Sequence, residues 1–169
     1  MASSLSVFLR DNNLLYELQS AFRSGHSTET ALIRLTDQIL KNMDNDEVTG
    51  LDFIDFRKAF DVIDHELLLK KLSIYGATPS SVAWFKSHLS ERKQFISFGK
   101  TTSNQLTVKQ GVPQGPILGL VLFLLFVNDM PPPRPKVNYG HYADDTTLSL
   151  SFKLENPAIT KSIFVTGPE

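Results

Sequence analysis

Apolar residues recur along the chain at two spacings, one typical of helices and one typical of strands. Over residues 28–43 they recur at every third or fourth position, which predicts an amphipathic helix. Its expected core face is Leu32, Leu35, Ile39 and Met43. The stretch 48–56 is short and rich in β-formers, and it predicts a buried strand that carries Asp55 near its C-terminal end.

Capping residues predict two more helices. Asp64 is a typical N-cap for a helix that closes near Gly76, and Thr78 with Pro79 opens the next one. The expected core face of that second helix is Val82, Phe85 and Leu89. Residues 117–127 are apolar throughout, but they are too few to span a bilayer, which needs roughly 20 residues. They therefore predict a buried core helix.

The remaining elements are strands and connections. Residues 93–98 and 105–109 predict a hairpin, and 136–142 and 146–152 predict two strands joined at an acidic turn. A loop with two glycines and two prolines, 110–116, leads into the apolar helix. The proline-rich stretch 131–135 predicts a stiff connector, and the tail, 153–169, shows no clear period. The pattern as a whole predicts one α+β domain.

The amino-acid composition excludes some kinds of site and some classes of protein. The 169 residues carry a formal net charge of −1, which gives no global field for nucleic acid and leaves that question to local sites. Cysteine is absent, so disulfides and thiolate metal sites are excluded. The four histidines do not form a pair at zinc-ligand spacing. The N-terminal residues show no secretory signal.

Three aspartates form the strongest candidate site. Asp55 ends a predicted strand, and Asp144 and Asp145 lie in the bend of a predicted hairpin. If the two elements share a sheet, the three carboxylates converge, and such a cluster needs cations to neutralise it. Oxygen ligands without histidine or cysteine select Mg²⁺ or Mn²⁺, and two such ions can support phosphoryl transfer. The plain alternative is an ordinary turn, because aspartate favours turns.

Three further features are weaker when taken singly. Phe60 follows Asp55 by five residues, and a core phenylalanine is the plain alternative. The glycine-bracketed loop 111–115 could bring backbone close to a ligand or could be a simple turn. Arg23, in a polar loop before a helix, suits a triphosphate, although most such arginines are merely exposed.

The order of these motifs is more specific than any one of them. "QSAFRSGHSTETAL", "LDFIDFRKAFDVIDHELLLKKL", "GVPQGPILG" and "YADDTTL" follow one another between about Leu14 and Phe152. In this order they closely resemble the reverse transcriptase of non-long-terminal-repeat (LINE-like) retrotransposons. The resemblance implies a right-hand polymerase fold, with residues 1–47 as part of the fingers and 48–152 as the palm, an antiparallel sheet backed by helices.

The resemblance also implies site roles. Asp55, Asp144 and Asp145 match the catalytic, metal-binding acids, which hold two Mg²⁺ ions, or Mn²⁺. The implied nucleotide-binding residues are Arg23 for the triphosphate, Phe60 as the sugar gate, Gln114 and Gly115 along template and nucleotide, and Ala143 beside the primer end. The implied partners are an RNA template, a DNA primer, a deoxynucleotide and the rest of a retrotransposon polyprotein, which often carries an endonuclease. The family works inside the cell, and no membrane partner is expected.

The chain departs from the family in ways that favour a second hypothesis. Asp52 lies in the catalytic strand where the family has an apolar residue, and Pro116 replaces a small hydroxyl residue. The thumb and primer grip are expected to be absent, so that the chain is a truncated copy. The alternative is therefore a non-catalytic remnant or a passive nucleic-acid-binding fragment. A related RNA-dependent RNA polymerase is a more distant option, which the "FRKAFD" and "VPQG" contexts disfavour.

Overall fold

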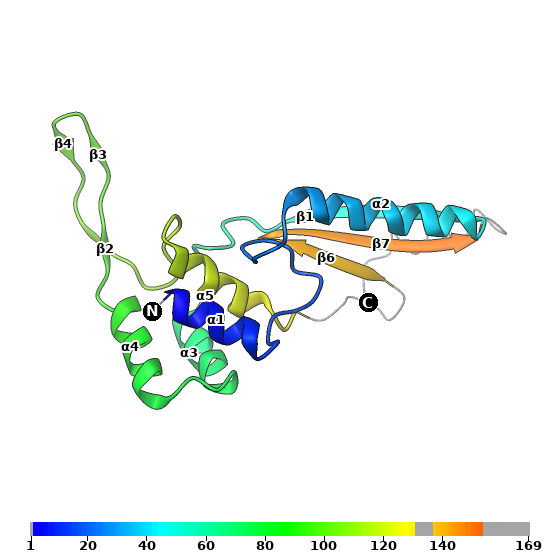
Figure 1. Ribbon diagram of the computed structural model, residues 1–169. Coiled ribbons are helices and arrows are strands. Elements are labelled where there is room, and N and C mark those ends of the chain that lie inside the picture. Colours follow the sequence, from blue (N-terminus) through cyan, green and yellow to red (C-terminus); the bar gives the residue numbers. More distant parts are fainter. Residues whose placement is uncertain (1, 131–136, 154–169) are drawn as a thin grey trace, which may run out of the picture.

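The computed structural model of the chain describes residues 2–130 and 137–153 and contains helices and antiparallel strands (Figure 1). The helices are α1 (Ala2–Asp11), α2 (Thr28–Asp44), α3 (His65–Ile74), α4 (Pro79–Leu89) and α5 (Ile117–Val127). The strands are β1 (Glu47–Asp55), β2 (Lys93–Gln94), β3 (Ser97–Phe98), β4 (Thr101–Thr102), β5 (Leu106–Thr107), β6 (Asn138–Tyr142) and β7 (Asp145–Lys153). No helix in these residues is long and apolar enough to cross a bilayer.

The main sheet has three antiparallel strands in the order β1, β7, β6, with β7 in the centre. β1 pairs with β7 along its whole length, from Glu47 opposite Lys153 to Asp55 opposite Asp145. The predicted strands and their acidic turn are therefore confirmed. Lys153 is the last residue of β7 and not part of a tail; the predicted connector 131–135 and the rest of the tail, 154–169, lie outside the described residues.

Helix α2 lies along one face of this sheet (Figure 1). Ser27 caps its N-terminus by accepting a hydrogen bond from the Thr30 amide, and the buried Asn42 donates to the Thr49 hydroxyl of β1 at 2.8 Å. The predicted core face is only partly correct, because Leu32 and Met43 are 62% and 61% exposed. Among the described elements α2 packs mainly on β1, so part of its apolar stripe is left uncovered.

The expectation that β1 is buried is wrong. None of its nine residues is buried, and Phe53 is 68% exposed. β1 forms one edge of the three-stranded sheet, so within the described residues its outer edge has no strand beside it. Asp52 is consequently exposed, and the desolvation penalty expected for an acid in a buried strand does not arise.

The hydrophobic core lies among the other helices. Asp64 caps α3 by accepting from the Leu67 amide at 2.8 Å, and Thr78 caps α4, as predicted. Helix α5 is apolar on all sides and packs against α1 and α3, which confirms the prediction of a buried core helix. The fully buried side chains of this core are Leu9, Ile63, Leu68, Leu72, Leu89, Leu122, Phe123, Leu124 and Leu125.

Asn128, just after α5, joins three parts of this core. Its Oδ1 accepts from the Tyr16 amide at 2.6 Å, and its Nδ2 donates to Leu14 O and to the Tyr75 hydroxyl, both at 2.7 Å. One side chain thus ties the segment after α1 to the ends of α3 and α5.

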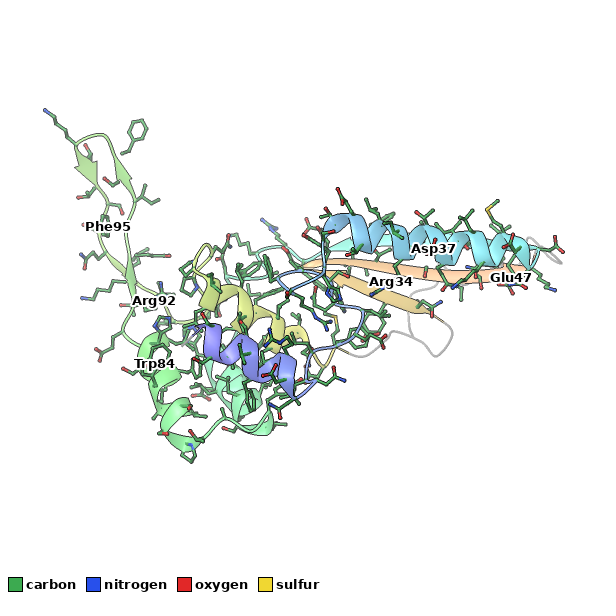
Figure 2. All side chains as sticks on the ribbon, viewed as in Figure 1. Arg34, Asp37, Glu47, Trp84, Arg92 and Phe95 are labelled. Atoms are coloured by element: carbon green, nitrogen blue, oxygen red, sulfur yellow. The ribbon has the colours of Figure 1, made fainter. Side chains whose placement is uncertain are left out.

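Two features differ from the prediction: one helix was not predicted, and the predicted hairpin has shorter strands than expected. Helix α1 was not expected, although Leu5 and Leu9, four positions apart, reach the core. The predicted 93–109 hairpin is present, but its pairs are only two residues long, and it forms an arm that projects from the end of α4 (Figure 1). Its apolar side chains, Phe95 among them, extend away from the helices (Figure 2).

Candidate active site

The acidic residues gather at one end of the sheet. Asp55, the last residue of β1, lies directly opposite Asp145, the first residue of β7. Directly opposed residues of antiparallel strands project to the same face, so these two carboxylates are cross-strand neighbours. Asp144 and Ala143 form the two-residue turn that joins β6 to β7. The structure thus brings all three predicted acids to one end of the sheet.

The donor set fits a hard divalent cation. Asp55 and Asp145 are exposed carboxylates on neighbouring strands, and Mg²⁺ usually takes one or two carboxylates together with waters and substrate phosphates. Within residues 2–130 and 137–153, however, no three histidine, cysteine, aspartate or glutamate side chains lie close enough together to hold a metal ion. Asp55 and Asp145 are therefore a ligand pair of the chemical type that Mg²⁺ takes, and the side chain of Asp144 does not complete a three-carboxylate cluster here.

Sequence reasoning missed Gln19, which contacts the acidic turn directly. Its Oε1 accepts from the Ala143 amide at 3.1 Å, and its Nε2 lies 3.4 Å from Ala143 O, to which it donates. Its side chain is buried, and the residues on either side of it, Leu18 and Ser20, exchange backbone hydrogen bonds with His141 of β6. The residues around Gln19 in the sequence do not indicate that it contacts Ala143, 124 residues away.

The Gly111–Gly115 loop is fastened to the chain that follows β1. The Gly111 amide donates to Ile63 O at 2.8 Å, and the Val112 amide donates to Phe60 O at 2.9 Å. A Cβ at Gly111 would lie 2.7 Å from Asp61 O, and Gly111 has φ +87°, so only glycine fits there. This loop and the segment after Asp55 therefore form one unit.

Within this unit the predicted nucleotide residues differ in exposure. Gln114 is exposed, and its Nε2 lies 3.4 Å from Asp61 Oδ1. Gly115 is exposed, with φ +102° and open space around it. Phe60 is half-buried, and its ring stacks on Phe123 of α5 with centroids 4.1 Å apart. The ring of Phe60 is thus held by the core.

Arg23 is half-buried and fixes the backbone of its own loop. Its Nη1 donates to Tyr16 O at 2.8 Å, to Gln19 O at 3.0 Å and to Glu17 O at 3.4 Å. Burial lowers the pKa of Arg23 below its usual value, and nearby Arg34 acts in the same direction. Nε and Nη2 of Arg23 make no hydrogen bond within the described residues and are the groups available to a ligand.

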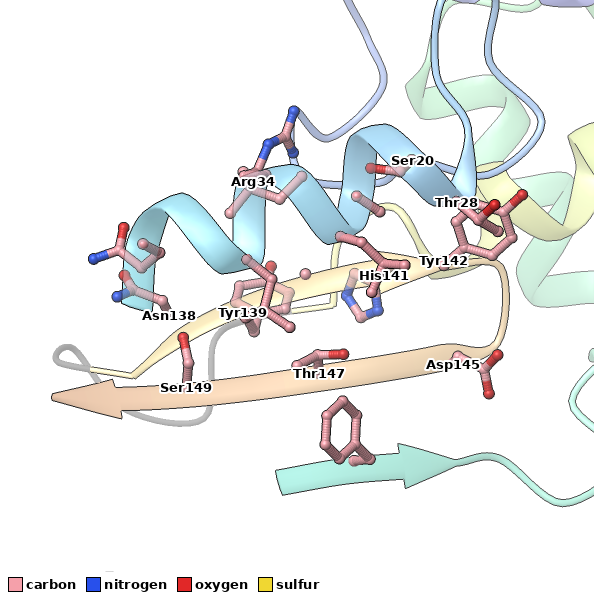
Figure 3. A pocket seen from close by; sticks show the side chains of 17 residues that line it. Ser20, Thr28, Arg34, Asn138, Tyr139, His141, Tyr142, Asp145, Thr147 and Ser149 are labelled. Carbon is pink, nitrogen blue, oxygen red and sulfur yellow. The ribbon is translucent and has the colours of Figure 1, made fainter. Parts of the chain in front are cut away.

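A cavity of about 400 Å³ lies between α2 and the sheet, with Asp145 at one end (Figure 3). His141 also lines it; Nδ1 of this histidine lies 2.8 Å from the Thr146 hydroxyl, while Nε2 is buried without a partner among the described residues. Burial lowers the pKa of His141, so the ring is neutral at pH 7. The cavity is lined mostly by apolar groups, and of the three candidate acids only Asp145 lines it.

The chain is similar to proteins described as RNA-directed DNA polymerases. It is 32% identical over 165 residues to a protein named "Probable RNA-directed DNA polymerase from transposon BS" of Drosophila melanogaster, covering 94% of this chain and 18% of that protein. It is 34% identical over 139 residues to the RNA-directed DNA polymerase from mobile element jockey of the same species, covering 78% and 15%. The chain thus spans less than a fifth of the length of these relatives.

A solved structure of Candida albicans telomerase, in complex with a fragment of telomeric RNA, shares the fold. The TM-score is 0.53 at 12% identity, and the match covers 96% of this chain and 30% of that one. The described strands and helices also agree with the mixed α and antiparallel β architecture expected from the sequence. Residues 1–167 match the family described as reverse transcriptase (RNA-dependent DNA polymerase), and the chain belongs to that family.

Proposed function

We propose that the chain is the central part of an RNA-directed DNA polymerase of a LINE-like retrotransposon, with residues 1–47 in the fingers and 48–152 in the palm. The reaction is attack by a primer 3′-OH on the α-phosphate of a deoxynucleotide, with pyrophosphate leaving. One observation carries the proposal: Asp55 lies opposite Asp145 at the end of the sheet where the Ala143–Asp144 turn joins β6 to β7.

In this proposal Asp55, Asp144 and Asp145 hold two Mg²⁺ ions, or Mn²⁺. The ions, when bound, supply positive charge that neutralises the triphosphate and the developing negative charge. The cross-strand pairing of Asp55 with Asp145 supports this proposal, and the protein's part is to keep these carboxylates at fixed positions. The turn that carries Asp144 is therefore as important to the site as the carboxylates themselves.

The nucleotide contacts in this proposal are those that the resemblance implies. Exposed Gln114 and Gly115 lie along the template and nucleotide, and Phe60 acts as the sugar gate, held in place by Phe123. Arg23 contacts the triphosphate through Nε and Nη2, because Nη1 is already used on backbone carbonyls. Ala143 lies beside the primer end. The partners are an RNA template, a DNA primer and the remainder of a longer polyprotein.

Primer extension tests the proposal. The chain is incubated with an RNA template, an annealed DNA primer, deoxynucleotides and Mg²⁺, and the Asp55→Asn and Asp144→Asn variants are compared with it. Each variant is expected to lose extension by at least about a hundredfold, because positioning and charge neutralisation supply most of the catalysis. The matched control is Asp37→Asn, an exposed acid on α2, which should extend at the wild-type rate. Extension that survives Asp144→Asn would overturn the assignment.

The sugar gate has its own test. Phe60→Ala should raise ribonucleotide incorporation relative to deoxynucleotide incorporation. Because Phe60 also stacks on Phe123, the substitution lowers stability, so the measured quantity is the ratio of the two rates, which does not depend on the folded fraction. An unchanged ratio would remove Phe60 from the nucleotide site.

A second candidate function is passive nucleic-acid binding by a non-catalytic remnant. It is favoured by the lack of a three-carboxylate cluster among the described residues. Under this alternative the wild-type chain binds a template–primer duplex in a gel-shift assay without extending it, and Asp144→Asn leaves the binding unchanged.

A further inference from the structure

We propose that Gln19 is a positioning residue of the acidic hairpin: it fixes the backbone of the turn that carries Asp144 and Asp145. The proposal rests on the proposed polymerase function for its purpose, while the contacts themselves stand independently of that function. Gln19 lies outside the carboxylates and outside the nucleotide-binding residues named above, and it acts through the backbone.

The contacts of Gln19 reach both sides of one residue. The Ala143 amide belongs to the peptide group before Ala143, and the Ala143 carbonyl belongs to the peptide group after it. Gln19 Oε1 accepts a hydrogen bond from the Ala143 amide at 3.1 Å, and Gln19 Nε2 donates one to the Ala143 carbonyl at 3.4 Å. Gln19 therefore restrains both backbone dihedrals of Ala143, and the second peptide group leads directly into Asp144.

The turn requires such a restraint. Ala143 has φ +57°, in the left-handed region, which is unfavourable for an L-residue other than glycine. Two-residue hairpin turns with positive φ usually use glycine or asparagine for this reason. With alanine in the turn, the observed conformation depends on outside hydrogen bonds, and Gln19 supplies two of them.

Gln19 is itself held firmly. Its side chain is 3% exposed, and its Oε1 also accepts from the Ala21 amide at 3.0 Å. The Ser20 amide donates to His141 O at 2.8 Å, and the His141 amide donates to Leu18 O at 3.0 Å, so the backbone around Gln19 is joined to β6. Because the carboxamide of Gln19 is fixed, it can hold the turn in place. An exposed carboxamide would move together with the turn and would not restrain it.

The test uses the full 169-residue chain with Gln19→Met, which keeps the side-chain volume and removes the hydrogen bonds. Amide hydrogen exchange at Ala143 should accelerate about tenfold, as expected for the loss of one buried hydrogen bond. Mn²⁺ affinity, measured from the electron paramagnetic resonance signal of free Mn²⁺, should fall about tenfold. The matched control is Gln38→Met, a half-buried glutamine on α2, which should change neither quantity.

Adding Ala143→Gly to Gln19→Met separates positioning from general packing. Glycine adopts positive φ without support, so the double variant should recover most of the Mn²⁺ affinity. If Gln19→Met folds and leaves both Ala143 exchange and Mn²⁺ affinity at wild-type values, the proposal is wrong. It is also wrong if Ala143→Gly gives no recovery.

The two proposals fail separately. If the wild-type chain binds no Mn²⁺ while Gln19→Met still accelerates exchange at Ala143, the restraint stands and the polymerase site fails. If Gln19→Met does not fold, hydrogen exchange in the wild-type chain tests the restraint instead. The side-chain amide protons of Gln19 should exchange at least about tenfold more slowly than those of exposed Gln114. Equal exchange rates for these two side chains would refute the restraint.

Discussion

Asp55 and Asp145 are direct cross-strand partners at the end of the sheet, so two like charges lie side by side on one face. Directly opposed like charges destabilise an antiparallel pair by roughly 0.2–1 kcal/mol. In metal-free buffer, Asp145→Asn should therefore raise the free energy of unfolding by an amount in that range. Urea denaturation with and without Mg²⁺ measures this, and the stabilisation by Mg²⁺ should be smaller in the variant than in the wild type.

The control for this prediction is Asp37→Asn, which removes an equally exposed acid from α2. It should leave the response to Mg²⁺ unchanged. Equal stabilisation of wild type and Asp145→Asn by Mg²⁺ would show that the opposed pair does not bind the ion.

Asn128 is expected to be the most costly polar side chain to remove from the helical core. Asn128→Ala leaves the Tyr16 amide, the Leu14 carbonyl and the Tyr75 hydroxyl without their partner. Unsatisfied groups of this kind cost roughly 1–3 kcal/mol, and thermal unfolding should show a loss in that range. Asn104→Ala, at an exposed position in the arm, should change stability by less than about 0.5 kcal/mol. Equal losses in the two variants would contradict the role of Asn128.

Gly111 and Gly25 distinguish two reasons for which a position requires glycine. Both have positive φ, +87° and +76°, so alanine is strained at either position. Only at Gly111 does a Cβ also meet backbone, 2.7 Å from Asp61 O, whereas Gly25 faces open space. Gly25→Ala should cost about 1–2 kcal/mol and Gly111→Ala distinctly more. Chemical denaturation of the two variants checks the order, and a reversed order would refute the close approach of the loop to Asp61.

His141 should make stability depend on pH. Burial lowers its folded-state pKa below the ordinary 6.5, so the unfolded chain binds a proton more readily than the folded one. The contribution is therefore present above pH 6.5 and is lost as pH falls below 6.5 toward the lowered folded value. The free energy of unfolding should drop between pH 7.5 and pH 5.5, and His141→Gln should show a smaller drop. His88→Gln, at an exposed histidine, should keep the wild-type drop.

Local patterns predicted the elements of this fold better than they predicted its burial. Caps and spacing are short-range, so the starts of α3 and α4 and the extent of α5 follow from neighbouring residues. The exposure of β1 and of Leu32 depends on how many strands the sheet has and which of them α2 covers, and no window of sequence contains that information.

The residues of the candidate site likewise fall into those that the sequence predicted and one that it did not. The order of the motifs predicts that Asp55, Asp144 and Asp145 belong to one site, because the resemblance carries long-range information that residue spacing lacks. Gln19 was missed because its partner is far away in sequence and its own neighbourhood reads as an ordinary polar loop. The roles assigned to Arg23, Phe60 and Gln114 remain predictions that come from the resemblance.

The register of β1 on β7 sets the order in which this chain can fold. Gly50 lies opposite Leu150, so the central ladder joins segments made at very different times during translation. Closing so long a loop is slow compared with forming α3 and α4, whose contacts are local. On the ribosome the helical pair can form early, while the ladder must wait for β7 to emerge. The acidic site is thus expected to assemble after the α3–α4 helical pair.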